Sequence, residues 1–151
     1  MSREDISNAE LIERTLELSK RKKIIWEYLD EFEDLYQHLN VIPKKKKIGS
    51  KPPIASLTET MTSALYINTF FDANESFYAR IGGNFIVLLR YMEKNEENVL
   101  VADRIKFMLV PHTFKGIKII EEDDKILRLH NYVKTQFPDV EDIINDIFKL
   151  E

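Results

Sequence analysis

The chemically reactive side chains of this sequence are few and scattered. Its three histidines are His38, His112 and His130, and none has a second histidine or a carboxylate at a metal-binding spacing such as HExxH. The chain has no cysteine, which excludes thiolate zinc sites, disulfides and a cysteine nucleophile. No GxGxxG, P-loop or GxSxG pattern occurs. The sequence therefore predicts no catalytic site, no cofactor and no metal, and an enzyme that uses Asp, Glu and Tyr alone is the remaining catalytic alternative.

Two basic runs are the strongest local indication of a function. The first is Lys20, Arg21, Lys22 and Lys23, and the second is Lys44, Lys45, Lys46 and Lys47. An exposed lysine run is read by nuclear import receptors or contacts phosphates through counterion release, and it is also typical of a plain solvated linker. An overall pI of about 5.5 argues against strong nucleic-acid binding. A nucleic-acid-associated nuclear factor, with both runs in one patch, is the alternative function.

Four apolar and aromatic side chains are the candidates for binding a protein partner. Trp26 and Tyr28 belong to a second apolar stripe beside the main one of the same segment, and such side chains often dominate interfaces. A helix that is apolar on two sides is also typical of the centre of a bundle. Leu11 and Leu18, earlier on the main stripe, have fewer partners within the chain. We therefore predict partner contacts through Leu11, Leu18, Trp26 and Tyr28.

A long helix is predicted to position these side chains. From Leu11 to Leu39, apolar residues recur in alternating steps of four and three, which is a helical period. Ser7 or Asn8 can cap the first turn. The pattern weakens at residues 20–23, where we expect a bend or a lysine whose stem lies along the stripe. Residues 1–40 are thus predicted to be one N-terminal helical element.

Residues 41–55 are predicted to be a flexible basic linker. Pro43, Gly49 and the pair Pro52-Pro53 interrupt regular structure there, because proline lacks an amide donor and restricts the residue before it. A capping box formed by Ser56 and Glu59 then favours a new helix. We expect residues 56–151 to form a helical core that packs on residues 24–39.

The sequence of residues 77–92 allows two interpretations, a helix and a hairpin. As a helix, they place Phe77, Ile81, Phe85, Leu88 and Met92 on one face. As strands, the segments on either side of Gly82-Gly83 form a hairpin, for which two glycines are a recognised turn signal. We favour the helix, because its spacing extends through the whole segment, and keep the hairpin as the alternative.

The remaining segments are predicted to be mostly helical. Val101, Ile105, Met108 and Leu109 fit a helix that Pro111 ends. The segment Met92-Glu93-Lys94, followed by the stretch from Ala102 to Leu109, resembles a helix-turn-helix passage near the end of the HEAT-type middle domain of translation-initiation scaffolds, but no functional residue transfers from it. Residues 113–120 fit a short strand or an irregular connection.

Two final helices are predicted near the C-terminus. Asp123 or Asp124 can cap the first of them, which runs through residues 126–137. Pro138 suits the first turn of the last helix. The apolar face of that helix is the clearest of the later patterns, and it consists of Val140, Ile143, Ile144, Ile147 and Phe148.

Composition and pattern together predict one all-α domain, either a helical bundle or a short helical stack with a coiled-coil-like N-terminal helix. The alternative is an α+β fold with the hairpin at Gly82-Gly83. With 151 residues, 44% of them hydrophobic, the chain can bury a core without disulfides or metals. No run of about 18 apolar residues is present, so we expect no membrane span, and we expect an intracellular location, nuclear or cytoplasmic. The predicted function is a non-catalytic protein-interaction module or regulatory subunit that binds a partner or a second copy.

Overall fold

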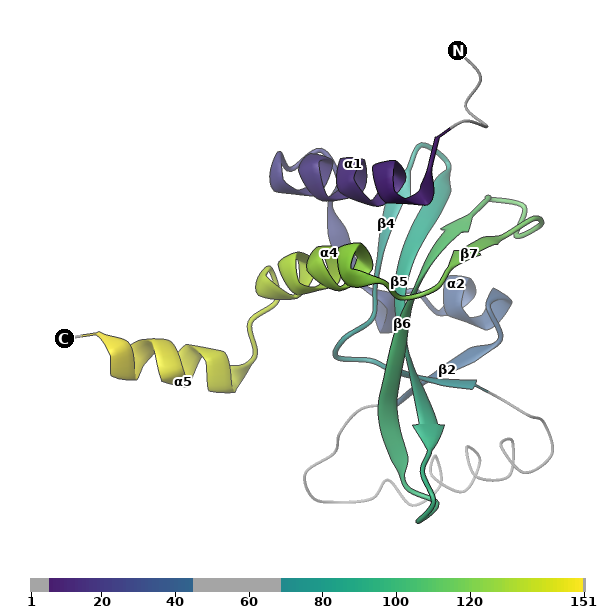
Figure 1. Ribbon diagram of the computed structural model, residues 1–151. Helices are drawn as coiled ribbons and strands as arrows, with labels where there is room; N and C mark the ends of the chain where they lie inside the picture. Colours follow the sequence, from purple (N-terminus) through teal and green to yellow (C-terminus); the bar gives the residue numbers. More distant parts are fainter. Residues whose placement is uncertain (1–5, 45–68, 151) are drawn as a thin grey trace.

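The computed structural model describes residues 6–44 and 69–150, which form a sheet-rich α+β fold (Figure 1). A seven-stranded sheet carries helices α1 and α4 side by side on one face, and helix α5 extends away from it. The helices are α1 (Asn8–Lys20), the 3-10 helix η2 (Leu29–Glu31), α2 (Glu33–His38), α4 (Asp124–Thr135) and α5 (Val140–Lys149). The strands are β1 (Trp26–Tyr28), β2 (Val41–Lys44), β3 (Thr69–Asp72), β4 (Phe77–Ile81), β5 (Asn84–Lys94), β6 (Leu100–Val110) and β7 (Lys118–Ile120).

The prediction of an all-α bundle is wrong. The strands follow the order β1-β4-β5-β3-β2, while β6 pairs with β5 and β7 pairs with β6. All pairs are antiparallel except β2 and β3. The fold is closer to the α+β alternative, and neither a helical bundle nor a coiled coil describes it.

Residues 77–92 form the β4–β5 hairpin, so the favoured helix was wrong and the alternative is confirmed. Ile81 pairs with Asn84 across the Gly82-Gly83 turn. Gly82 has φ of +61°, a left-handed conformation that glycine adopts without the steric cost of a Cβ atom. The helical spacing led to the wrong prediction because β5 is buried on both faces from Phe85 to Leu89, which makes its apolar run continuous.

Residues 100–110 form strand β6, and the predicted helix in this segment is also wrong. Ile105 and Phe107 pack on one side of the sheet, and Met108 and Val110 on the other. This alternation has the period of two that strands require. The resemblance to a helix-turn-helix passage therefore has no counterpart in the fold. Residues 118–120 form β7, which matches the strand reading of that connection.

The long helix of residues 8–40 is interrupted at Lys20. Ser7 caps α1 as predicted, since its side chain accepts a hydrogen bond from the amide of Glu10. The helix ends where Lys22 adopts a left-handed φ of 59°. The aromatic residues Trp26 and Tyr28 that follow belong to β1, which pairs with β4 and places Trp26 opposite Ala79. The apolar residues keep the same helical spacing before and after the break. The sequence pattern therefore did not indicate the change from helix to strand.

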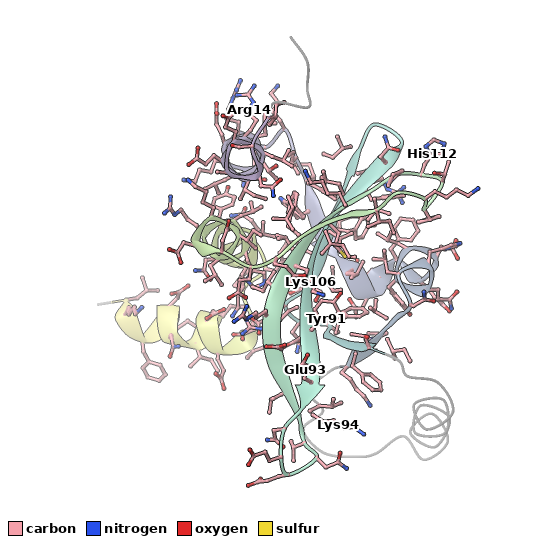
Figure 2. All side chains as sticks on the ribbon, turned by 45° about the vertical axis from the view of Figure 1, so that its right-hand side comes forward. Arg14, Tyr91, Glu93, Lys94, Lys106 and His112 are labelled. Atoms are coloured by element: carbon pink, nitrogen blue, oxygen red, sulfur yellow. The ribbon has the colours of Figure 1, made fainter. Side chains whose placement is uncertain are left out.

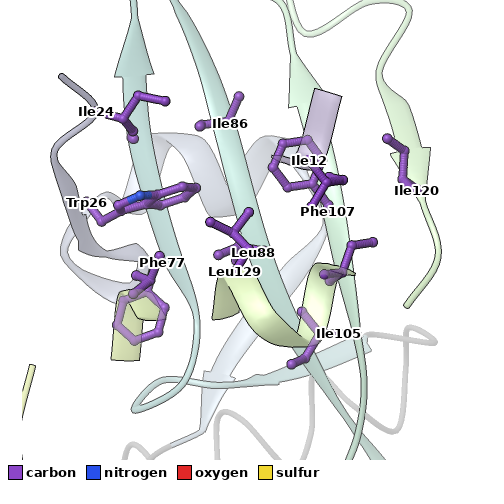
Figure 3. Close-up of a cluster of buried hydrophobic side chains, with 13 residues drawn as sticks. Ile12, Ile24, Trp26, Phe77, Ile86, Leu88, Ile105, Phe107, Ile120 and Leu129 are labelled. Carbon is purple, nitrogen blue, oxygen red and sulfur yellow. The ribbon is translucent and has the colours of Figure 1, made fainter. Parts of the chain in front are cut away.

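Two apolar cores lie on opposite faces of the sheet. The helix-side core, drawn in Figure 3, packs Ile12 of α1 and Ile126, Leu129 and Val133 of α4 on sheet residues. Those sheet residues include Trp26, Phe77, Ile86, Leu88, Ile105 and Phe107. The second core, on the other face, contains Leu29, Leu35, Val41, Phe71, Tyr78, Phe85, Val87, Leu89, Met108 and Val110. Both faces of β5 are therefore covered, which explains its unbroken apolar sequence.

The predicted linker is structured at its start. Residues 41–44 form β2, which runs parallel to β3 with Val41 opposite Thr69. Pro43 is tolerated in this short strand, as proline is at sheet edges. The rest of the linker and the helix predicted from Ser56 lie outside the described residues.

Both C-terminal helices are confirmed. Asp123 caps α4 by accepting a hydrogen bond from the amide of Ile126. Helix α5 begins at Val140 with Asp139 as its N-cap, so Pro138 precedes the helix instead of lying in its first turn as predicted. The helical core expected over residues 56–151 is otherwise replaced by strands, and only α4 and α5 in its described part are helical as predicted.

Candidate functional site

Helix α5 has a well-defined start. Asp139 and Asp142 form a capping box in which the Asp139 carboxylate accepts from the Asp142 amide (2.8 Å) and the Asp142 carboxylate accepts from the Asp139 amide (3.1 Å). Glu141 in the first turn and Lys149 in the last turn suit the helix dipole. Local sequence thus accounts for the place where the helix begins.

The apolar face of α5 is open to solvent, and no residue of this helix is buried. The exposed fractions are 71% for Val140, 50% for Ile143, 45% for Ile144, 58% for Ile147, 82% for Phe148 and 79% for Leu150, just beyond the helix. The first four are at positions i, i+3, i+4 and i+7, so they form one stripe along the helix. We call these six residues the apolar stripe.

The polar side of α5 faces the body of the molecule. Asp142 and Asp146 line a hollow together with Asn131, Lys134 and Thr135 of α4. Figures 1 and 2, which differ by a 45° rotation, both show α5 projecting away from the sheet. An ordinary amphipathic helix of a globular protein turns its apolar side inward. Helix α5 does the opposite, which leaves the apolar stripe available.

The apolar stripe has an acidic rim. At about 100° per residue, Glu141 falls beside Phe148 on one border, and Asp146 is the acidic residue nearest Ile143 on the other, whereas Asp142 lies farther round on the polar side. Lys149 is the one basic residue of α5. The stripe is thus apolar at its centre and negatively charged on both sides.

The two residues before Pro138, Gln136 and Phe137, form the root of α5 and are firmly attached to the body of the molecule. The ring of Phe137 lies 5.0 Å from that of Phe77 and 4.7 Å from that of Tyr28, measured between centroids. The Lys22 ammonium donates to the side-chain oxygen of Gln136, the C-cap of α4, at 2.7 Å. The chain is therefore anchored up to the residue before Pro138, and α5 begins directly after this anchor.

A polar network holds α4 to the β3–β4 connection. The Glu75 carboxylate pairs with Arg90 (3.2 Å) and Lys134 (3.0 Å), and the buried His130 ring donates to the Glu75 carbonyl oxygen (2.8 Å). Burial lowers the pKa of His130 below its usual value. Burial alone would raise the pKa of Glu75, but Lys134 and Arg90 outweigh it and the net shift is downward. Lys134 and Arg90 thus favour the charged form of Glu75, and burial favours the neutral form of His130.

The four predicted partner-binding residues lie in or against the core of the chain itself. Trp26 is buried, and its indole N–H donates to the Ser19 hydroxyl at 2.9 Å. Tyr28 packs on Phe77 and Phe137. Leu11 and Leu18 are partly buried against the helix-side core. The structure does not gather them on one open surface, and partner contact through them stays a prediction.

The two basic runs lie on different parts of the molecule. Lys20, Arg21, Lys22 and Lys23 are all exposed at and after the end of α1. Lys44 lies in β2 with its ammonium 5.0 Å from the centre of the Phe70 ring, and residues 45–47 lie outside the described part. In both Figures 1 and 2, β2 is far below α1. The structure therefore does not bring Lys44 to the first run.

The histidines have structural surroundings. His38 stacks on Phe114 with ring centres 4.0 Å apart, and the backbone amide of His112 donates to the Asn84 side chain. Within residues 6–44 and 69–150, no three His, Asp or Glu side chains gather as a metal site would require. In the same ranges, no helix has the length and apolar character to cross a membrane.

Sequence reasoning located α5 and its apolar residues but missed their role as a candidate site. The helical period was a sufficient signal for the stripe. Its exposure depends on the fold of the sheet and had no local signal in the sequence.

Comparison with known proteins identifies no relative: no protein-family model, no curated protein and no solved structure matches this chain.

Proposed function

We propose that this protein is a non-catalytic protein-interaction module whose binding element is the apolar stripe of α5. The observation that carries the proposal is the outward orientation of this stripe on a helix whose polar side faces α4. Monomeric soluble proteins rarely expose contiguous apolar patches of more than a few hundred Å² unless the patch has a function.

The spacing of the stripe fits a helix-in-groove interaction. In such an interaction, the groove of the partner binds apolar side chains at positions i, i+3, i+4 and i+7 of a helix, which are Val140, Ile143, Ile144 and Ile147 here. Phe148 adds an exposed aromatic side chain, and aromatic residues are enriched at the cores of protein interfaces. Because the residues just before α5 are anchored, the stripe begins at a fixed place on the surface.

The charge of α5 favours a protein surface over other ligands. Its acidic rim would be repelled by phosphates and by anionic lipid headgroups, whereas membrane-surface helices are usually rich in lysine and arginine. Nucleic-acid binding draws no support from the basic runs either, since Lys44 lies apart from the first run. A groove with an apolar floor and basic edges is the best match.

Two substitutions that add the same charge on opposite sides of α5 test this function. Ile143→Asp places a carboxylate in the apolar stripe, and Asn145→Asp places one on the polar side. Tagged wild-type protein and both variants are used to capture proteins from nuclease-treated lysate of the source cells. We expect one set of proteins to be retained by wild type and Asn145→Asp and lost with Ile143→Asp. Equal retention by all three would refute a role for the stripe.

A further inference from the structure

We propose that the occupant of the apolar stripe is the α5 helix of a second copy of this chain, so that two copies form a two-fold symmetric dimer. This inference rests on the proposed function, because it names the partner of the same surface. Three observations support it: the self-complementary apolar stripe, the area that it exposes, and the basic run beside the root of α5.

The first support is shape and symmetry. A two-fold axis pairs a surface with itself, so a single straight apolar stripe on a projecting helix is a suitable contact. An antiparallel pair would place Ile144, near the middle of the stripe, close to the axis. No rearrangement of the folded body is required, because α5 already stands away from the sheet (Figure 1).

The second support is area. Taking about 150 Å² for a fully exposed large apolar side chain, the six exposed fractions correspond to about 600 Å² per copy. Pairing two stripes would then remove at most about 1,200 Å² in total, if all six side chains of each copy were covered, which is the lower end of the range for specific stable interfaces. The stripe is therefore large enough for a dimer, and the expected affinity is moderate.

The third support is charge. Two α5 helices with acidic rims would repel each other if nothing neutralised them. The root of α5 lies beside the run Lys20, Arg21, Lys22 and Lys23, as the bond from Lys22 to Gln136 shows. In an antiparallel pair, the C-terminal half of one α5, including Asp146, reaches the root of the other α5 and hence the basic run of that copy. Charge complementarity between copies thus offsets the repulsion of the rims.

The absence of cysteine from the sequence makes a single-cysteine test clean. Ile144→Cys in the otherwise unchanged full chain should form a disulfide-linked dimer on mild oxidation. The control Asn145→Cys is on the polar side of α5 and should form no disulfide-linked dimer under the same oxidation. Sedimentation of the wild type should show a reversible monomer–dimer equilibrium, and Ile144→Asp should weaken it at least about tenfold.

A charge-exchange cycle tests the role of the basic run. Lys20→Glu with Lys23→Glu, and separately Asp146→Lys, should each weaken the dimer several-fold. The variant that combines all three should recover affinity, because the rim and the run regain opposite signs. Weakened dimerisation without recovery in the combined variant would overturn the charge pairing.

The results separate the two proposals. A wild-type protein that stays monomeric, with the thiol of Ile144→Cys freely reactive toward a soluble reagent, would overturn the dimer and leave the stripe open for a different protein. A monomer in which that thiol is unreactive would mean that α5 packs on its own chain, and would overturn the proposed function as well.

Discussion

Two isoleucine-to-alanine substitutions, one in α4 and one in α5, test whether the apolar stripe is exposed for a partner or packed in the core of the chain. Ile126 in α4 is 0% exposed, and Ile147 in α5 is 58% exposed. Both lie within helices, so replacement by alanine changes helix propensity in the same favourable direction at the two positions, by up to about 0.7 kcal/mol. Any large difference between the two variants must therefore come from packing.

The expected magnitudes differ widely. Ile126→Ala removes buried methyl and methylene groups and leaves a cavity in the helix-side core, at an expected cost of about 2–5 kcal/mol of unfolding free energy. Ile147→Ala removes atoms that contact mainly water, so the expected change in dilute protein is within about 0.5 kcal/mol.

Urea denaturation followed by Trp26 fluorescence measures both effects. Trp26 is the single tryptophan and is buried in the helix-side core, so its emission reports unfolding of the body. In concentrated protein, where α5 would be covered by a partner copy, Ile147→Ala should become more destabilising while Ile126→Ala keeps the same cost. A loss of more than about 1.5 kcal/mol for Ile147→Ala in dilute protein would refute the open position of the stripe.

Three further predictions concern the body of the fold. Burial lowers the pKa of His130 in the folded protein, so His130 is protonated first in the unfolded chain as the pH falls below about 6.5. The contribution of His130 to the free energy of unfolding is therefore full above that pH and is lost as the pH falls toward the pKa of the folded state. The melting temperature should therefore fall more between about pH 7.5 and 5.5 in wild type than in His130→Gln, and equal falls would contradict the assignment. Gly82→Ala should cost about 1 kcal/mol in thermal unfolding because of its positive φ, whereas Gly83→Ala, which has no such φ and meets no atom within 4 Å, should be nearly neutral. Ser19→Ala should cost about 1–3 kcal/mol in urea denaturation by leaving the indole N–H of Trp26 unpaired, and an unchanged midpoint would show that this bond contributes little.

Local signals predicted the helices of this fold better than its sheet. Capping residues located the starts of α1 and α4, because a cap acts within one helical turn, and amphipathic spacing located α5 without fixing its first residue. The strands were missed where apolar residues occupy both faces, as in β5, since a continuous apolar run fits a helix and a strand equally well. Gly82-Gly83 was the one turn signal that pointed to the hairpin, and the regular helical spacing around it outweighed it.

The candidate site shows a second limit of sequence reasoning. The apolar residues of α5 and those of α4 recur with the same helical period, yet Ile126 in α4 is buried and Ile147 in α5 is exposed. Which of two amphipathic helices covers a sheet depends on the space that other elements leave. Here α1 and α4 together cover the helix-side core, and α5 lies away from it. Likewise Trp26, which looked like a partner anchor, lies in β1 and is buried.

Amide hydrogen exchange of residues 140–149 tests the open position of α5 most directly. A short helix with an uncovered apolar face opens easily, so in dilute protein its amides should exchange much faster than those of α4, which packs on the sheet. Protection of α5 should then rise with protein concentration as the stripe becomes covered. Amides of α5 that are as protected as those of α4 in dilute protein would contradict an interaction surface at this helix.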